Sequence, residues 1–337
     1  MQRTCRNCML KLKNHLGQIF LVVIFITCSS FTIVMRLVFL GTSAMVPTKE
    51  RNVQSIYLDY NGEGILLDCG EGTQRQLQFA NLNAQKITTI LISHWHGDHV
   101  SGLIGLLQTL GHFCGEEKKT LHLFGPKDSK KYLNNLLSSC IFELNIHLEV
   151  TEIDSSQLTL CRQTNQYEIH AQNLEHSVPT LGFRFIKKPR YSIIPSKLAQ
   201  LNIPVGPHLQ QLQQGKSIDF QGQTISPQEV CQYHSQKSIA FVFDTRECSA
   251  CYSLAESADL LVCEAVYTHD LLHKAHEYFH MTAQQAAQLA SQSSAQELIL
   301  THFSQRFKDV SVLQDEAKNI FPNTTCAYDF MKKELDF

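Results

Sequence analysis

Three histidines and one aspartate lie within six positions of the segment LISHWHGDHVSGL, residues 91–103. The apolar run ITTILIS, which leads into them, is typical of a strand buried on both faces. His94 and His96 are separated by one residue in an extended stretch, so their side chains point to the same side of the chain. Gly97 allows a sharp turn into a helix that we expect to begin near Ser101. The segment therefore predicts a loop at the C-terminal edge of a strand, with polar side chains directed outward.

This loop carries four side chains of the types that bind metal ions, namely His94, His96, Asp98 and His99. Neutral imidazole and carboxylate suit Zn²⁺, and Mn²⁺ is the alternative. Four ligands from one loop cannot all converge on one tetrahedral ion and leave an open position, so two ions are favoured. The further ligands would come from other side chains that follow apolar, strand-like runs, and the candidates are His176, Asp244 and His302.

The rest of the chain alternates strand-like and helix-like segments. SIYLDYNGEGILLDCGEG is typical of a hairpin with Asn61-Gly62 as its turn, and SIAFVFDT and ELILTHFS are typical of buried strands. Thr282 and Gln285 have the spacing of a capping box at the start of a helix. The two halves each mix sheet and helix, which predicts an α/β fold with an αβ/βα layered sandwich.

Residues 1–34 precede this pattern and allow two interpretations. Basic residues are followed by an uncharged apolar stretch, residues 17–35, which resembles a signal peptide or a short membrane anchor. Insertion in that orientation would place the body of the protein outside the cytoplasm. The favoured alternative is a spurious extension, with the protein opening at Met35, because Met35 begins a clean strand. The folded domain is then 35–337, and membrane contact is expected only if the leader is real.

The overall charge is nearly neutral, with 29 Lys and Arg against 31 Asp and Glu, so an anionic partner would have to meet a local patch. Between Arg184 and Ile218 there are six basic residues and no acidic one. A solvated insertion with incidental charge is the alternative, but we favour contacts with the phosphates of an anionic partner. The candidate contacts are Lys187, Lys188, Arg190 and Lys197.

The twelve cysteines lie mostly in apolar stretches, which favours reduced, buried thiols and a cytoplasmic protein. Two CxxC pairs, Cys5/Cys8 and Cys248/Cys251, could in principle form a four-thiolate zinc site. Zinc-knuckle turns usually carry glycine, and the first pair lies in the leader, so reduced thiols are the preferred interpretation.

The HWHGDH motif resembles the signature of the metallo-β-lactamase superfamily, which lactamases, glyoxalases and nucleases share. FLGTSAMVPTKERNVQSI, LLDCGEGTQRQL, HGDHVSGLIGLLQTL, LFGPK and HMTAQQAAQLA together are similar to the ribonuclease Z family of tRNA 3′-processing endonucleases. The similarity runs from Met35 to about Phe307. It implies a four-layer αβ/βα metallo-β-lactamase sandwich with a protruding RNA-binding arm inserted at about 184–237.

The resemblance also implies a function, a zinc-dependent endoribonuclease that removes 3′ trailers from precursor tRNA. One zinc would be held by His94, His96 and His176, and a second by Asp98, His99 and His302, with Asp244 bridging the two. Asp98 would also accept a proton, and His280 in the HMTA element would donate one to the leaving 3′-oxygen. In this family the arm of one subunit serves the active site of the other, which implies a homodimer.

The chain departs from the family pattern at two positions beside these residues. Phe243 stands where the family usually has glycine and could crowd Asp244, and Met281 stands where it usually has serine. Glu264 matches an acidic position of the family and could orient a neighbour. A phosphodiesterase or arylsulfatase acting on small esters is the alternative function, which would not need the arm. A non-catalytic RNA-binding relative is disfavoured because all seven ligands are present.

Overall fold

The computed structural model describes residues 11–13, 19–21, 34–112 and 118–336 of the 337-residue chain. The chain divides into two units, Met1–Ile33 and Val34–Phe337. In the first unit, β1 (Lys11–Lys13) pairs with β2 (Ile19–Leu21) as an antiparallel ladder. Most of the apolar stretch of the anchor hypothesis lies outside the described residues. Within the described ranges, no helix has both the length and the apolar character needed to cross a membrane.

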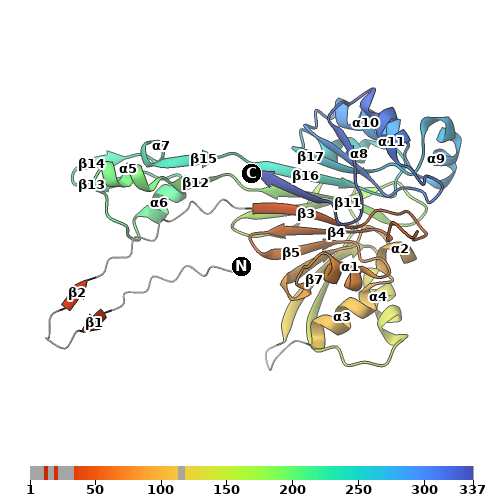
Figure 1. Cartoon of the computed structure of the whole chain (residues 1–337), viewed down its shortest axis with the longest axis horizontal. Helices are drawn as coiled ribbons and strands as arrows, with labels where there is room; N and C mark the ends of the chain where they lie inside the picture. Colours follow the sequence, from red (N-terminus) through yellow and green to blue (C-terminus); the bar gives the residue numbers. More distant parts are fainter. Residues whose placement is uncertain (1–10, 14–18, 22–33, 113–117, 337) are drawn as a thin grey trace. The chain divides into compact units, whose positions relative to one another are not determined.

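The second unit is built on two seven-stranded sheets (Figure 1). The first sheet has the order β20-β3-β4-β5-β6-β7-β8, in which β20 to β5 are antiparallel neighbours and β5 to β8 are parallel. Its strands are β3 (Val34–Gly41), β4 (Ser55–Tyr60), β5 (Glu63–Leu67), β6 (Ile87–Leu91), β7 (Lys119–Pro126), β8 (Ile146–Ile153) and β20 (Lys332–Asp336). Its helices are α1 (Thr73–Phe79), η1 (Ala84–Lys86), α2 (Gly97–Val100), α3 (Leu103–His112) and α4 (Ser129–Ser138).

The second sheet has the order β19-β18-β17-β16-β11-β10-β9. Its strands are β9 (Thr159–Gln163), β10 (Tyr167–Leu174), β11 (Thr180–Lys187), β16 (Lys237–Val242), β17 (Leu260–Glu264), β18 (Leu298–Thr301) and β19 (Thr324–Cys326). The helices that accompany it are α8 (Ser249–Ala255), η2 (His269–Leu271), α9 (Leu272–Tyr278), α10 (Ala283–Gln292) and α11 (Ser311–Lys318). The strands from β16 to β19 are parallel, so their C-terminal ends meet at one edge of the sheet.

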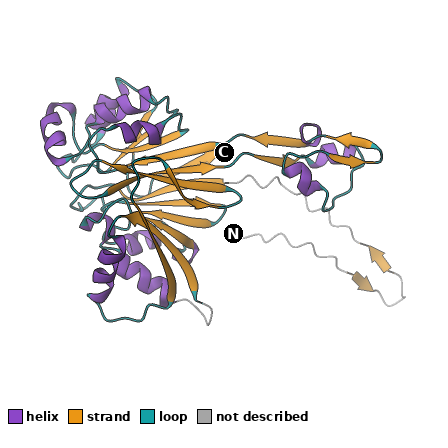
Figure 2. Cartoon of the chain, turned by 180° about the vertical axis from the view of Figure 1, so that it is seen from behind, coloured by secondary structure: helices purple, strands orange, loops and turns teal. Residues whose placement is uncertain are grey.

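The two sheets face one another, and helices cover their outer faces (Figure 2). Between the sheets, the ring of Tyr60 on β4 packs against Tyr167 on β10 and Phe185 on β11, with centroid distances of 5.6 and 5.5 Å. Helices α1, α3 and α4 share a buried core with the first sheet, and α8, α10 and α11 share one with the second. The predicted four-layer αβ/βα sandwich is therefore confirmed. The predicted capping box of Thr282 and Gln285 starts α10.

An inserted segment connects β11 to β16 and has a small core of its own. Its elements are β12 (Arg190–Ile193), α5 (Pro195–Gln200), α6 (Leu209–Gln213), β13 (Ile218–Phe220), β14 (Gln223–Ile225), α7 (Pro227–Val230) and β15 (Cys231–His234). β12 pairs with β15, and Leu198, Leu212 and Val230 are among the residues buried between these elements. We call residues 188–236 the arm. The predicted arm began at 184, but residues 184–187 belong to β11.

The proposed RNA contact of Lys187 is wrong, because this residue closes β11 with its side chain buried. Its ammonium nitrogen has no hydrogen-bond partner among the described residues. Burial lowers its pKa to about 8, and the charges of Arg190 and Lys237 act in the same direction. A buried amine cannot reach a phosphate on the surface of a macromolecule. The other three candidates are partly exposed, and Lys188 forms an ion pair with Glu168 at 3.2 Å.

Candidate metal centre

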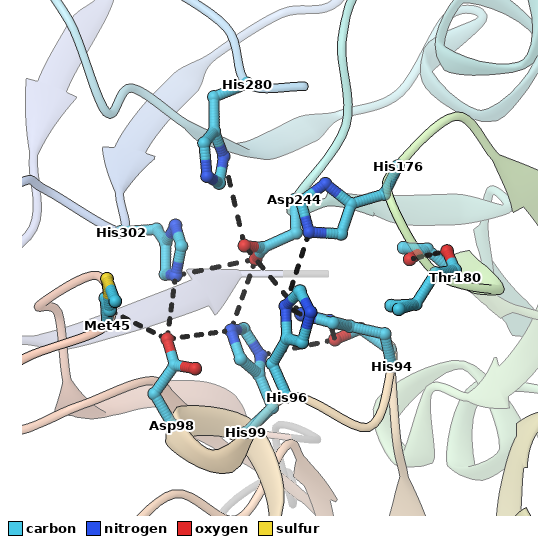
Figure 3. A network of polar contacts seen from close by, with 12 residues as sticks. Met45, His94, His96, Asp98, His99, His176, Thr180, Asp244, His280 and His302 are labelled. Atoms are coloured by element: carbon cyan, nitrogen blue, oxygen red, sulfur yellow. Dashed lines mark hydrogen bonds and ion pairs between the residues drawn. The ribbon is translucent and has the colours of Figure 1, made fainter. Parts of the chain in front are cut away.

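All seven predicted ligands converge on one region of the second unit (Figure 3). Each of them follows the C-terminal end of a strand, in the segment that connects this strand to the next strand. The segment after β6 carries four of them, two in the loop and two in α2, and the loops after β10, β16 and β18 carry one each: His94 and His96, Asp98 and His99, then His176, Asp244 and His302.

The first group of side chains consists of His94, His96 and His176. Nδ1 of His96 lies 2.9 Å from Nε2 of His94 and 3.4 Å from Nε2 of His176. Nδ1 of His176 is turned away and lies 3.1 Å from the carbonyl oxygen of Phe279, to which it can donate. Three imidazole nitrogens therefore face a common point, as the ligands of a tetrahedral ion do.

The second group consists of Asp98, His99 and His302. Oδ2 of Asp98 lies 3.3 Å from Nε2 of His99 and 3.6 Å from Nε2 of His302. Asp244 stands between the two groups. Its Oδ2 lies 3.3 Å from Nε2 of His99, whereas its Oδ1 lies 4.0 Å from Nε2 of His94. The carboxylate of Asp244 thus faces both groups of side chains, as a ligand shared by two ions would.

Several polar atoms of the cluster are buried without a hydrogen-bond partner among the described residues, including Nε2 of His99, Nε2 of His302 and Oδ2 of Asp244. Leaving such atoms unpaired costs about 1–3 kcal/mol each. A cation bound between them would satisfy all three. Although burial raises the pKa of Asp244, the neighbouring imidazoles of His302, His99 and His94 lower it overall, so the carboxylate is charged. The donor set therefore fits two divalent metal ions.

Asp68 fixes the orientation of His99. Its Oδ2 lies 2.7 Å from Nδ1 of His99, so that nitrogen carries the proton and Nε2 is left for a metal. The Ser93 N–H and hydroxyl donate to the same carboxylate at 2.7 and 2.8 Å. Asp68 was not among the predicted site residues. The signal that could have found it is its place directly after the strand-like run GILL, in the same position that the predicted ligands occupy.

His280 approaches the cluster from the residues that follow α9 and is held by Glu264, a fully buried side chain at the end of β17. Nδ1 of His280 lies 2.9 Å from Oε2 of Glu264 and 3.9 Å from Oδ1 of Asp244. Burial lowers the pKa of His280, but the charge of Glu264 and its hydrogen bond outweigh this and raise it to about 9. His280 is therefore an imidazolium at neutral pH and can donate a proton.

The two departures from the family pattern are accommodated inside the protein. Phe243 is 2 % exposed, and its ring lies 6.2 Å from that of Phe241. Met281 is fully buried in the core between the second sheet and its helices, and its N–H donates to Oε2 of Glu264. Met281 thus contributes a backbone donor to the carboxylate that holds His280.

A cavity of about 420 Å³ gives access to the cluster, and its rim includes Met45 and Tyr278. The Met45 N–H donates to Oδ2 of Asp98 at 2.8 Å. A neighbouring cavity of about 310 Å³ shares Met45, Tyr278 and His280 with the first and adds Lys274 and Arg306. Sequence reasoning missed these rim residues because they follow no strand-end pattern.

The chain is similar to proteins named ribonuclease Z or tRNase Z and to other proteins of the metallo-β-lactamase fold. A family model described as Anti-Pycsar protein Apyc1 matches residues 35–185, which is less than half of the chain. The ribonuclease Z of Chlamydia pneumoniae is 36% identical over 295 residues, covering 88% of this chain and 94% of the relative. The crystal structure of the short form of human tRNase Z superposes with a TM-score of 0.62 at 27% identity, covering 89% of this chain and 98% of that one. YhfI from Bacillus subtilis, a metallo-β-lactamase fold protein, has a TM-score of 0.64 at 19% identity, with coverage of 90% and 100%.

The fold, the paired histidine–aspartate groups and the ribonuclease Z relatives together define a hydrolase of the metallo-β-lactamase superfamily. Within that superfamily, the identity and coverage of its relatives are high enough to assign a family. The chain belongs to the ribonuclease Z family.

Proposed function

We propose that this chain is a zinc-dependent endoribonuclease that removes 3′ trailers from precursor tRNA. The observation that carries the proposal is the pair of ligand groups that share Asp244, with the imidazolium of His280 at the same cavity. The related proteins named ribonuclease Z and tRNase Z support the choice of substrate. They do not favour the small-ester alternative.

The chemistry divides between the metal ions and the side chains. We propose that His94, His96 and His176 hold one zinc, that Asp98, His99 and His302 hold the other, and that Asp244 is shared. Zinc ions held by these residues would polarise a phosphodiester and would lower the pKa of a water molecule toward neutrality.

The proton transfers fall to two side chains of the cavity. Asp98 takes the proton of the water that attacks phosphorus. His280 donates its proton to the 3′-oxygen that leaves, so that the tRNA ends in a hydroxyl and the trailer keeps the phosphate. Glu264 is a positioning residue, because it reaches the reaction only through His280.

The arm is the proposed tRNA-binding element. Lys188, Arg190 and Lys197 are partly exposed cations on or beside it, and such side chains contact phosphates without reading sequence. We further propose that the enzyme is a homodimer in which the arm of one subunit serves the other's active site. A cytoplasmic location is part of the proposal, and the eight described cysteines, all of them free thiols, are consistent with it.

The test is cleavage of a 3′-extended precursor tRNA by the purified chain, with and without a zinc chelator. We expect a single cut at the 3′ end, loss of cleavage with chelator, and recovery on adding Zn²⁺. Elemental analysis of the active protein should find about two zinc ions per chain. Asp244→Ala should lose most activity, while Lys130→Ala on the exposed face of α4 should not. Cleavage that survives complete metal removal contradicts the proposal, as does hydrolysis of small esters without any action on tRNA.

A further inference from the structure

Cys248 and Cys251 form a close pair of thiols that the proposed chemistry does not use. Their sulfur atoms lie 3.6 Å apart, with Cys248 at the start of α8 and Cys251 within it. The Cys251 N–H also donates to the carbonyl oxygen of Cys248 at 3.1 Å. Because a disulfide bond is about 2.05 Å long, a shift of roughly 1.5 Å would join the two sulfurs. None of the histidine, cysteine and carboxylate groups that could hold a metal among the described residues includes this pair. The pair therefore calls for an explanation other than metal binding.

The two thiols have different environments, and the difference suits disulfide exchange. Cys248 is partly exposed, whereas Cys251 is buried. The hydrogen bond from the Cys251 thiol and the backbone N–H groups of Cys251 and Ala250 lower the pKa of Cys248 to about 6. That same hydrogen bond raises the pKa of Cys251. An accessible thiolate beside a protonated partner is the arrangement of an attacking and a resolving cysteine. In the cores, by contrast, burial raises the pKa of Cys69 and Cys263.

The pair is linked to the metal centre through a short loop. This loop, residues 244–248, begins at Asp244 and ends at Cys248. Within it, the hydroxyl of Thr245 lies 4.0 Å from the sulfur of Cys248. The Thr245 N–H donates to Oε1 of Glu264 at 2.6 Å, and the other oxygen of Glu264 holds His280. A movement of Cys248 toward Cys251 therefore pulls on the loop that carries the shared ligand and contacts the positioning carboxylate.

We propose that Cys248 and Cys251 are a reversible redox site whose disulfide displaces loop 244–248 and lowers the activity of the metal centre. The Cys248 thiolate attacks one sulfur of a small-molecule disulfide, such as glutathione disulfide, and expels one thiolate. Cys251 then attacks the Cys248 sulfur and expels the second. One expelled thiolate takes the proton of Cys251, and the other takes from solvent the proton that Cys248 released when it ionised, so one disulfide is reduced to two thiols as the protein disulfide forms. The effect on activity rests on the proposed function, whereas formation of the disulfide does not.

Disulfide formation is tested by incubating the full chain with glutathione disulfide and measuring intact mass and cysteine-linked peptides. We expect a loss of about two mass units, a peptide linking Cys248 to Cys251, and reversal by dithiothreitol. Cys251→Ala should instead trap a glutathione adduct on Cys248, and Cys248→Ser should prevent both products. Cys161→Ser, which removes a partly exposed thiol on β9, is the matched control and should still form the disulfide. A Cys248 that reacts with glutathione but is never resolved by Cys251 overturns the proposal.

The link to the metal centre is tested by comparing the oxidised and reduced forms of the same preparation. We expect oxidation to lower kcat for precursor tRNA and for bis(p-nitrophenyl) phosphate by roughly tenfold, because displacing a catalytic group by about 1 Å can cost up to a hundredfold in rate. Oxidised protein should also release zinc faster to a coloured chelator, which requires no substrate. Cys248→Ser, which forms neither the disulfide nor the glutathione adduct, should be insensitive in both measurements. If the disulfide forms but changes neither zinc release nor ester hydrolysis, the proposal that it regulates the metal centre is wrong. Absence of tRNA cleavage in both states contradicts only the proposed function, because zinc release still reports on the loop.

Discussion

At the scale of single residues, one buried carboxylate sets the protonation state of the proposed acid. Glu264 holds the pKa of His280 at about 9, against an ordinary value of 6.5. A raised pKa keeps the donor protonated at neutral pH, so the contribution of His280 should be complete below its ordinary pKa and lost as the pH rises through about 9. Glu264→Gln keeps a hydrogen-bond acceptor but removes the charge. We expect the alkaline limb of the kcat profile to move down by about two pH units, with little change at pH 6.

The control for this prediction is the direct removal of the donor. His280→Ala should abolish the alkaline limb altogether, whereas Glu264→Gln should only move it. Metal content should be measured for both variants, since neither side chain is a proposed ligand. An unchanged alkaline limb in Glu264→Gln would show that His280 is not the acid or that Glu264 does not set its pKa.

Met45 carries a different kind of residue-scale prediction. Its backbone is left-handed, with φ of 61°, and its side chain is 80% exposed. A non-glycine residue is destabilised by roughly 1–2 kcal/mol in this conformation, and glycine avoids that cost. Glycine also makes the unfolded chain more flexible, which offsets about 0.5–1 kcal/mol of the gain. Met45→Gly should therefore raise the free energy of unfolding by about 0.5 kcal/mol in urea denaturation. The neighbouring Val46, which lacks positive φ, is the control, and Val46→Gly should destabilise. A Met45→Gly protein less stable than wild type would show that the side chain packs more than its exposure indicates.

At the scale of elements, strand periodicity explains both what the sequence could predict and what it could not. The ligand loop after β6 was predictable because its apolar strand and its polar side chains are adjacent in the chain. Lys187 was wrongly predicted to contact RNA because the prediction used only its positive charge and ignored the alternation of buried and exposed side chains along β11. Along TLGFRFIK, the buried positions Leu181, Phe183 and Phe185 share one face with Lys187, which the period of two could have indicated. Asp68 directly follows an apolar run, as the predicted ligands do, but its contact with His99 depends on the pairing of β5 with β6, which the local sequence does not show.

The arm is the element whose role can be separated from the chemistry. Replacing Lys188, Arg190 and Lys197 by alanine removes phosphate contacts that only a large RNA can use. We expect KM for precursor tRNA to rise and the dependence of cleavage on salt to weaken, because fewer counterions are released on binding. Hydrolysis of bis(p-nitrophenyl) phosphate should be nearly unchanged. Lys130→Ala with Lys131→Ala on α4 is the control for lost positive charge alone. Normal cleavage by the arm variant across a salt series would remove the arm from the proposal and revive the small-ester alternative.

At the scale of the whole molecule, the leader can be tested by truncation. β3 begins at Val34, and Met35 is already fully buried in the sheet. A chain that starts at Met35 therefore keeps nearly all of that strand and its pairing with β4 and β20. We expect it to match the full chain in thermal unfolding, zinc content and tRNA cleavage. Loss of activity or of solubility on truncation would favour a real leader over a spurious extension.

The dimer proposal makes the last whole-molecule prediction, because a shared site can be rebuilt from two defective subunits. The first variant carries Asp244→Ala and keeps its arm. The second lacks residues 189–235, with a short glycine-containing turn joining β11 to β16, which are antiparallel neighbours. Each alone should cleave precursor tRNA poorly, although the armless variant should hydrolyse bis(p-nitrophenyl) phosphate. If the subunits exchange freely, half of the dimers are mixed and each has one complete site, so activity should recover to about a quarter of wild type. Light scattering should give the mass of a dimer for both variants. No recovery after proven exchange would mean that each arm serves its own subunit, and a monomeric mass would end the proposal of a shared site.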